Sequence, residues 1–222
     1  MLIRDGQVRL NGTSPRNPET PVRLGVDRIE VDGRRVESAE KIYLMLNKPR
    51  GIVTSAADEK GRDTVYSLLP KNVEWIAPVG RLDKASEGLL LITNDSDWAA
   101  RVTDPATHLD KTYHVQVGRV ADELLVNSLL RGVETPRGER LKVKAAKLLR
   151  AGEKNSWLEI VLDEGKNRHI RRMLDGLGEE VLRLIRVAIG PLQLGDLGKG
   201  TSRTLTEREK NMVDVAMTRL AR

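Results

Sequence analysis

The feature that most constrains the fold is a short apolar run, Leu89 to Ile92, that continues into Thr93. Its residues do not alternate between apolar and polar, as those of a strand with one face in water would. Gly88 precedes the run and Asn94-Asp95 follow it, and these residue types favour turns. The length of the run and its continuous apolarity therefore predict a buried strand.

The remaining patterns predict an α+β fold with a mostly antiparallel sheet and flanking helices. Alternating or apolar segments predict strands near residues 8–12, 27–33, 42–46, 112–117, 141–148, 157–162 and 181–189. Helical spacing and end signals predict helices at 97–102, 122–130, 166–177 and 206–220. Thr206 and Glu209 are three residues apart, which predicts a capping box for the last helix.

The chain is expected to form two domains. Residues 1–36 contain the first two predicted strands and a loop with three prolines, and they read as a small unit. Residues 37–41 are expected to be a linker. Residues 42–222 are long enough for a sizeable core and form the larger domain.

The composition excludes several classes of protein. Without cysteine the chain has no disulfide, thiol nucleophile or thiolate metal site, and it fits a reducing compartment. No apolar run approaches the roughly 20 residues that cross a bilayer, and the N-terminus lacks the regions of a secretion signal. We therefore expect a cytoplasmic protein without a membrane partner.

The charge distribution indicates a polyanionic partner. The net charge is +6, and residues 1–40 contain seven basic and seven acidic residues, so the whole positive excess lies after them. Lys and Arg bind nucleic acid by displacing counterions from phosphates. Aromatic residues make up only 3% of the chain, which argues against a surface that stacks many bases. Phosphate contacts and the binding of one extruded base fit this composition better.

The segment Gly80 to Asp95 places Arg81 and Asp83 in a glycine-containing loop that leads into the predicted buried strand. A loop anchored on a rigid scaffold is a good position for a reactive side chain. The alternative is that Asp83 is a turn or capping residue, as Asp beside Gly and Ser usually is. The residues next to Asp83, taken alone, favour this alternative.

The whole segment 80–95 resembles the signature of the ribosomal small-subunit-type (Rsu) family of pseudouridine synthases. Other blocks that resemble the family occur in its order at 46–51, 111–113, 164–173, 182–190 and 194–205. The resemblance implies the pseudouridine synthase fold and an enzyme that converts a specific uridine of ribosomal RNA to pseudouridine. The family's chemistry requires no metal and no cofactor. We expect the protein to act as a monomer.

The resemblance also implies roles for individual residues. Asp83 is expected to be the nucleophile, which can split the reaction through a covalent intermediate. Attack on the sugar, attack on the base and removal of a sugar proton all stay open. Tyr113 is expected to lie against the base, and Arg171 to pair with the aspartate, because a nearby cation favours the ionised carboxylate. Leu184 is the candidate apolar contact of the uracil, with core packing as its alternative. Arg81 would hold the flipped nucleotide or fill its place in the RNA.

The predicted helix 166–177 supports an RNA site. Its apolar residues form one stripe, and three arginines fall largely on the opposite side, namely Arg168, Arg171 and Arg172. Few acidic residues lie in that first turn and a half. The arginines and Lys166 therefore suit contacts with phosphates or with a carboxylate in a cleft, although a solvated basic face is the ordinary explanation.

Two features depart from the family pattern. Residues 3–36 resemble only the second half of an alpha-L RNA-binding motif, the small domain also found in ribosomal protein S-four. We therefore expect a truncated motif that contributes little RNA affinity. His169 stands where glutamine is common, and because both side chains can donate a hydrogen bond we expect a small effect.

Other functions are less well supported. Asp83 and Glu87 are the only attractive nearby carboxylate pair for a glycosidase, but residues 86–88 read as a turn. The three histidines lack metal-ligand spacing, and Gly200 interrupts the Lys-Ser/Thr pair of a phosphate-binding loop. The remaining alternative is a non-catalytic RNA-binding or ribosome-assembly protein on the same fold, which would not need a carboxylate at position 83.

Overall fold

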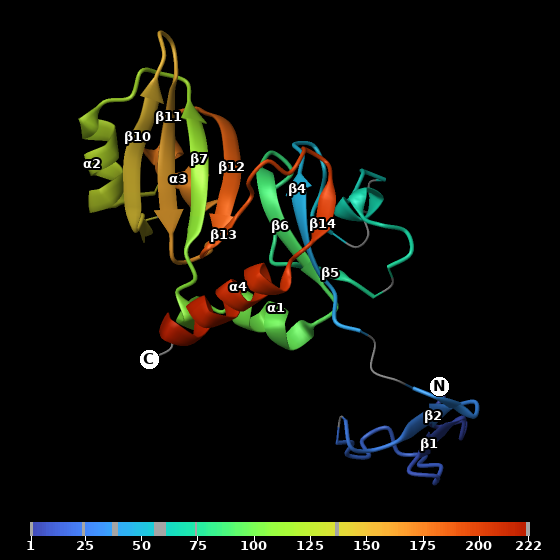
Figure 1. The fold of residues 1–222 in the computed structure, drawn as a ribbon. Coiled ribbons are helices and arrows are strands. Elements are labelled where there is room, and N and C mark those ends of the chain that lie inside the picture. Colours follow the sequence, from blue (N-terminus) through green and yellow to red (C-terminus); the bar gives the residue numbers. More distant parts are fainter. Residues whose placement is uncertain are drawn as a thin grey trace. The chain divides into compact units, whose positions relative to one another are not determined.

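The chain divides into two compact units, Met1–Lys41 and Ile42–Arg222 (Figure 1). The computed structural model describes residues 2–23, 25–36, 40–55, 61–73, 75–135 and 138–220. Most of the linker expected at 37–41 lies outside these ranges. Across them, no helix has the length and apolarity to span a membrane.

The first unit, in its described residues, contains a three-stranded antiparallel sheet of β1 (Val8–Leu10), β2 (Ile29–Val31) and β3 (Arg34–Arg35). β1 and β2 lie within the strands predicted from the sequence. Asp32 and Gly33 join β2 to β3 with φ of +50° and +76°. Two successive positive φ values are typical of the tight hairpin turn that Asp-Gly favours.

The second unit is built on a sheet that has nine strands when counted over the described residues. The strands are β4 (Tyr43–Lys48), β5 (Ala77–Val79), β6 (Glu87–Thr93), β7 (Lys111–Val117), β10 (Ala145–Ala151), β11 (Ser156–Leu162), β12 (Val181–Ile189), β13 (Leu192–Gln193) and β14 (Ser202–Thr204). Their main order is β10-β11-β7-β12-β6-β4-β14, with β13 paired to β12 and β5 to β6. β12 runs parallel to β6, and the other described pairs are antiparallel, which confirms the predicted α+β class.

β6 is buried along its whole length, as its sequence predicted. Leu89 and Leu91 face a core that α1 (Ser96–Thr103) and α4 (Glu207–Leu220) complete, and Figure 1 shows these helices next to one another. Leu90 and Ile92 face a second core, closed by the 3-10 helix η1 (Val65–Leu68). Glu87 and Gly88 belong to the strand, so the turn predicted at 86–88 is wrong for these two residues.

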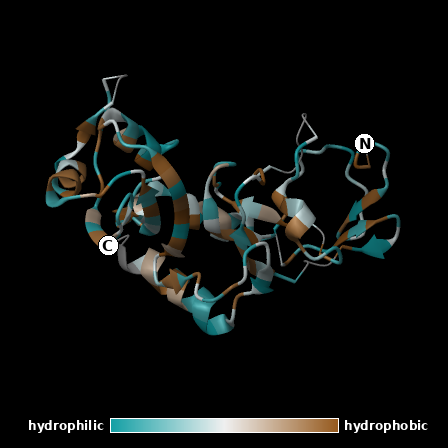
Figure 2. Ribbon diagram, turned by 90° about the horizontal axis from the view of Figure 1, so that it is seen from above, coloured by the Kyte–Doolittle hydropathy of each residue, from teal (hydrophilic) through white to brown (hydrophobic). Residues whose placement is uncertain are grey.

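A third core lies between the sheet and two further helices, α2 (Glu123–Arg131) and α3 (His169–Gly176). Alternate residues of β11, from Ser156 to Leu162, are buried there, and β7 contributes Val115 and Val117. Hydrophobic and hydrophilic residues alternate along the helices (Figure 2), as expected for helices with one face on a core.

Two predicted helix ends are confirmed. The Asp122 side chain accepts a hydrogen bond from the backbone N–H of Leu125 (2.9 Å), and Gly132, with φ +90°, ends α2. The Glu209 N–H donates to the Thr206 hydroxyl (3.2 Å), and the Thr206 N–H donates back to the Glu209 carboxylate (2.9 Å). These bonds satisfy N–H groups that the first turn of a helix leaves unpaired.

Two predicted elements are wrong in their bounds. The helix predicted at 166–177 begins at His169, because Arg168 has φ +50°, a left-handed conformation that cannot continue a helix. The strand predicted at 141–148 is split. β9 (Arg140–Leu141) pairs with β8 (Val133–Glu134), and β10 begins only at Ala145. A further 3-10 helix, η2, covers Pro105–Thr107.

Candidate active site

The loop of residues 80–86 connects β5 to β6 and carries Asp83. Within this loop, each of the five backbone carbonyl oxygens of residues 82–86 accepts a hydrogen bond. The donors, in loop order, are Thr54 Oγ1 (2.8 Å), Ser86 N (2.9 Å), Gly51 N (2.8 Å), Arg171 Nη2 (3.0 Å) and Lys48 Nζ (2.9 Å). Because each bond restrains one peptide group, the loop is fixed at every residue from 82 to 86. The Asp83 side chain therefore projects from a rigid support.

Lys48, at the end of β4, is the donor that the sequence analysis missed. Its side chain is fully buried, and its ammonium also donates to the carbonyl of Pro49 (3.0 Å). Burial lowers the pKa of Lys48 to about 8, while the charges of Asp83 and Glu87 oppose that shift. The sequence did contain a signal for this residue. Lys48 closely follows an apolar run that was predicted as a strand, and a lysine that is buried at the end of such a strand needs hydrogen-bond partners. Nothing in the sequence indicated that its partner would be the carbonyl of Ser86, 38 residues further on.

A cavity of about 400 Å³ opens beside the loop. It is lined by six residues that the sequence analysis singled out, namely Arg81, Asp83, Tyr113, Lys166, Arg168 and Leu184. The side chains of Asp83 and Arg168 are 24% and 53% exposed, whereas Leu184, Ser86 and Arg186 are buried. The cavity therefore has an exposed, charged mouth and a buried floor.

The arginine nearest to the Asp83 carboxylate is Arg168. Its Nη1 lies 3.9 Å from Asp83 Oδ2. Arg171, which was expected to make this pair, donates instead to the Ala85 carbonyl, and no Arg171–Asp83 ion pair within 4 Å occurs among the described residues. Burial lowers the pKa of Arg171, the charge of Arg168 lowers it further, and Asp83 acts in the opposite direction. The expected contact is thus corrected, and Arg171 supports the loop that carries Asp83.

Lys166 and Arg172 share an acidic partner that the sequence analysis did not anticipate. Glu139 forms an ion pair with Arg172 and another with Lys166 (3.3 Å), and Lys166 also lies 3.3 Å from Glu164. The hydrogen bond from Arg172 is the main cause that lowers the pKa of Glu139. Lys166 lines the cavity but Arg172 is not among its described lining residues. The acidic partner of this basic cluster therefore comes from outside the first turn and a half of the helix, where the sequence has few acids.

Glu87 does not form a carboxylate pair with Asp83. Its side chain is 3% exposed and is held by Arg183 (3.0 Å) and Lys199 (2.5 Å). Burial acts to raise the pKa of Glu87, but the hydrogen bonds from Arg183 and Lys199 outweigh it, so the pKa is lowered. A group held ionised in this way cannot act as the proton donor that a glycosidase needs. Among the described residues, no cluster of three or more His, Cys, Asp or Glu side chains could hold a metal ion.

His169 is buried at the start of α3, and its Nε2 donates to the carbonyl of Lys142 (3.0 Å). Burial lowers the pKa of His169, and the nearby charge of Glu164 opposes that shift. The unfolded chain therefore binds a proton here at higher pH than the folded chain does. The stabilisation is complete above the unfolded pKa of about 6.5 and is lost as the pH falls below it.

We predict that His169→Gln weakens this loss of stability at low pH, because glutamine keeps a donor for Lys142 and has no proton to bind. Urea unfolding between about pH 7.5 and 5.5 measures the slope of stability against pH. His108→Asn is the matched control, because His108 is exposed and has φ +45°, which asparagine tolerates. Equal slopes for the native chain and His169→Gln would contradict the prediction.

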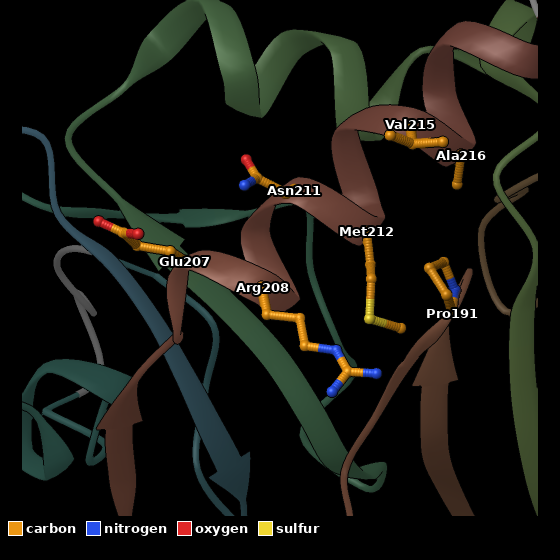
Figure 3. Close-up of a pocket in the computed structure, with 7 residues that line it drawn as sticks. All are labelled: Pro191, Glu207, Arg208, Asn211, Met212, Val215 and Ala216. Carbon is orange, nitrogen blue, oxygen red and sulfur yellow. The ribbon is translucent and has the colours of Figure 1, made fainter.

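A second hollow, of about 650 Å³, lies along α4 (Figure 3). It is lined by Pro191, Glu207, Arg208, Asn211, Met212, Val215 and Ala216. Met212 and Val215 are exposed. None of the predicted site residues lines it, so the site is the smaller cavity beside Asp83.

Three comparisons relate the chain to known proteins. Residues 42–175 match the model of the RNA pseudouridylate synthase family. A ribosomal large subunit pseudouridine synthase B of Bacillus subtilis (strain 168) is 38% identical over 210 residues, which cover 94% of this chain and 85% of that protein. An RNA pseudouridine synthase of Aquifex aeolicus (strain VF5) is 37% identical over 209 residues, 94% of this chain and 84% of that one. A crystal structure of a pseudouridylate synthase matches with a TM-score of 0.69 at 30% identity, over 96% of this chain and 90% of that one.

Proposed function

The chain belongs to the RNA pseudouridylate synthase family, and we propose that it converts one uridine of ribosomal RNA to pseudouridine with Asp83 as nucleophile. The observation that carries this proposal is the position of Asp83, Tyr113 and Leu184 around one cavity. The relative from Bacillus subtilis is named for the large ribosomal subunit. We therefore propose RNA of that subunit as the substrate; the resemblance to the ribosomal small-subunit-type family did not identify the subunit.

The reaction breaks the bond between sugar C1′ and uracil N1, turns the uracil, and joins C1′ to uracil C5. The base loses the hydrogen at C5 and gains one at N1, so the reaction consumes no oxidant or reductant. Tyr113 and Leu184 lie on the neighbouring strands β7 and β12, and in our proposal they contact the base. Asp83, on the rigid loop, acts where the base joins the sugar.

The target uridine has to leave the RNA stack to reach a partly buried carboxylate, at a cost of roughly a few kcal/mol. Contacts between basic side chains at the mouth and RNA phosphates offset this cost. Arg168 and Arg81 are exposed and line the cavity, so we propose that they hold the flipped nucleotide. RNA affinity is accordingly expected to fall as salt rises.

Arg171→Ala should lower turnover more than RNA affinity, because Arg171 holds the Ala85 carbonyl of the loop and is partly buried. A small displacement of a reacting group can cost about 100-fold in rate, and we expect a loss of that order. Turnover and RNA affinity are measured side by side, with Arg208→Ala on the exposed start of α4 as control. Equal losses of turnover and affinity would make Arg171 a phosphate contact instead.

The experiment that tests the proposed function is a map of pseudouridine in ribosomal RNA from cells with and without this protein. We expect one site, in the large-subunit RNA, to remain uridine when the protein is absent. A non-catalytic RNA-binding protein would leave the map unchanged. An unchanged map, with the purified protein also inactive on ribosomal RNA, would overturn the proposal.

We further propose that the first unit is a truncated alpha-L motif that adds little RNA affinity. Two of its arginines are already paired, Arg23 with Asp27 (3.5 Å) and Arg28 with Glu30, which leaves less positive charge for phosphates. We also propose that the protein works in the cytoplasm, as a monomer. Sedimentation of the purified chain, alone and with RNA, measures its oligomeric state and so tests whether it is a monomer.

A further inference from the structure

The floor of the cavity holds a buried arginine whose bonding is incomplete. Arg186, on β12, is 6% exposed, and its Nε donates to the carbonyl of Leu89 (2.7 Å). Its Nη2 is also buried and has no hydrogen-bond partner among the described residues. A buried donor without a partner is rare in folded proteins, so such a group in a cavity points to a ligand that completes its bonding.

A second cation, Lys111 on β7, lines the same cavity. Burial lowers the pKa of Lys111, and the charge of Arg186 lowers it further, so the two cations lie close enough to repel one another. Neither makes an ion pair within 4 Å in the described part of the chain. The nearby Asp110 is held by Lys144 (2.7 Å), and Asp163 faces His108 (3.9 Å). Asp163 lines the same cavity, and the charges of Asp110 and Asp163 oppose the lowering of the Lys111 pKa, but neither carboxylate lies within 4 Å of Lys111 or Arg186 in the described residues. The cavity therefore holds two cations without an ion-pair partner of their own.

In the pose of the proposed function, it is the base of the flipped nucleotide that points to this floor. The RNA backbone is continuous, so both phosphates that flank the target must stay at the mouth, beside Asp83 and Arg168. With the sugar at Asp83, the base points inward, and the ring atom opposite N1 is C4 with its oxygen O4. Arginine and lysine have only donors, and a uracil carbonyl has only acceptor sites, so the two match.

We propose that Arg186 and Lys111 bind the distal carbonyl oxygen of the target uracil and stabilise the negative charge of the base once it is detached. This proposal rests on the proposed function. When the C1′–N1 bond breaks, its electron pair leaves with the uracil and is shared among N1, O2 and O4, while an Asp83 oxygen bonds to C1′. Rejoining reverses this: C5 bonds to C1′, Asp83 leaves with its electron pair, and a proton passes from C5 to N1. Fixed cations in a site shielded from water stabilise such a charge strongly.

The same arrangement suits the turning of the base. Rotation of uracil by half a turn about the axis through N3 and C6 exchanges N1 with C5 and O2 with O4. A carbonyl oxygen therefore faces the floor both before and after the rotation. Cytosine has an amino group at C4, which would meet these donors without an acceptor. Arg186 and Lys111 thus also select uracil against cytosine.

The test uses the full chain in single turnover on the ribosomal RNA, measuring how fast the C1′–N1 bond breaks. Arg186→Met should slow this step by about 100-fold and Lys111→Met by about tenfold or more, with smaller changes in RNA affinity. Arg186→Lys should recover part of the loss, because it keeps the charge.

RNA with 5-fluorouridine at the target gives the decisive readout. Fluorine stabilises the detached anion, so both methionine variants should lose less rate on it than on uridine.

Arg186→Met also removes the donor to Leu89, so its folding is checked by thermal unfolding. Lys111→Met removes no hydrogen bond or ion pair found among the described residues, and it decides the question if Arg186→Met unfolds. Native rates for Lys111→Met, or equal losses on uridine and 5-fluorouridine, would overturn the proposal. Asp83→Asn is run in parallel. If it converts uridine at the native rate, the assignment of Asp83 as nucleophile in the proposed function fails, whereas an inactive Asp83→Asn beside a fully active Lys111→Met overturns this inference alone.

Discussion

Replacing Asp83 by asparagine should abolish formation of pseudouridine while folding and RNA binding stay close to those of the native chain. Asparagine has the same shape, and the backbone bond from Ser86 N–H to the carbonyl of residue 83 is kept (2.9 Å). The neutral amide is a poor nucleophile. We therefore expect turnover to fall by about 10⁴-fold or more, as it does when the catalytic nucleophile of other enzymes is removed. Mass spectrometry of the RNA measures conversion, and filter binding measures affinity.

The matched control for this variant is Asp175→Asn, on the exposed side of α3. It makes the same chemical change outside the cavity and should leave turnover unaltered. Substantial activity in Asp83→Asn would refute the assignment of the nucleophile. A loss of RNA affinity as large as the loss of turnover would show that position 83 serves in binding.

Gly88→Ala should destabilise the protein more than any other single-methyl change in the second unit. Gly88 has φ +103°, and a Cβ at this position would lie 2.3 Å from the carbonyl oxygen and 2.8 Å from the backbone nitrogen of Arg186. Both atoms are backbone, so they cannot turn away. A non-glycine residue at this φ costs about 1–3 kcal/mol, and the overlap of the Cβ with the backbone costs a similar amount. We therefore expect Gly88→Ala to lower the free energy of unfolding, measured with urea, by about 3 kcal/mol or more.

Gly165→Ala is the control for that measurement, because its φ is not positive and a Cβ there would meet no atom within 4 Å. Equal stability of the two alanine variants would contradict the close approach of β6 and β12. The approach matters for the site as well, since it brings Arg186 to the carbonyl of Leu89 and into the cavity.

Features set by neighbouring residues could be predicted from the sequence. The burial of β6 follows from its continuous apolarity, and the ends of α2 and α4 follow from the caps at Asp122, Gly132 and Thr206. The burial and the helix ends use information within a few residues of the feature they describe. Asp83 and Tyr113 were singled out differently, by the resemblance of the segment 80–95 and the other ordered blocks to the family, and the structure brings both to one cavity.

Features set by contacts between distant segments could not be predicted. Lys48 reaches the Ser86 carbonyl across 38 residues, and Arg172 reaches Glu139 across 33. The left-handed φ of Arg168 is another example, because arginine has no local preference for it. With this dihedral angle the helix starts at His169 and not at residue 166, and Arg168, rather than Arg171, lies within 4 Å of Asp83.

The hydrogen bonds to the loop explain how a chain of modest size can position one carboxylate. Donors from three separate segments hold the carbonyls of residues 82–86, at Lys48 to Thr54, at Ser86 itself and at Arg171. Two of these donors, Lys48 and Arg171, are cations whose burial lowers their pKa. Both cations therefore give up hydration to hold the loop that carries Asp83.

A crystal structure of Asp83→Asn bound to a fragment of ribosomal RNA that contains the target uridine tests the central claim most directly. We expect the uridine to be turned out of the RNA, with its base between Tyr113 and Leu184 and its C1′ about 3.5 Å from the side chain at position 83. A uridine that stays stacked in the RNA, or a base that lies in the hollow along α4, would contradict the account.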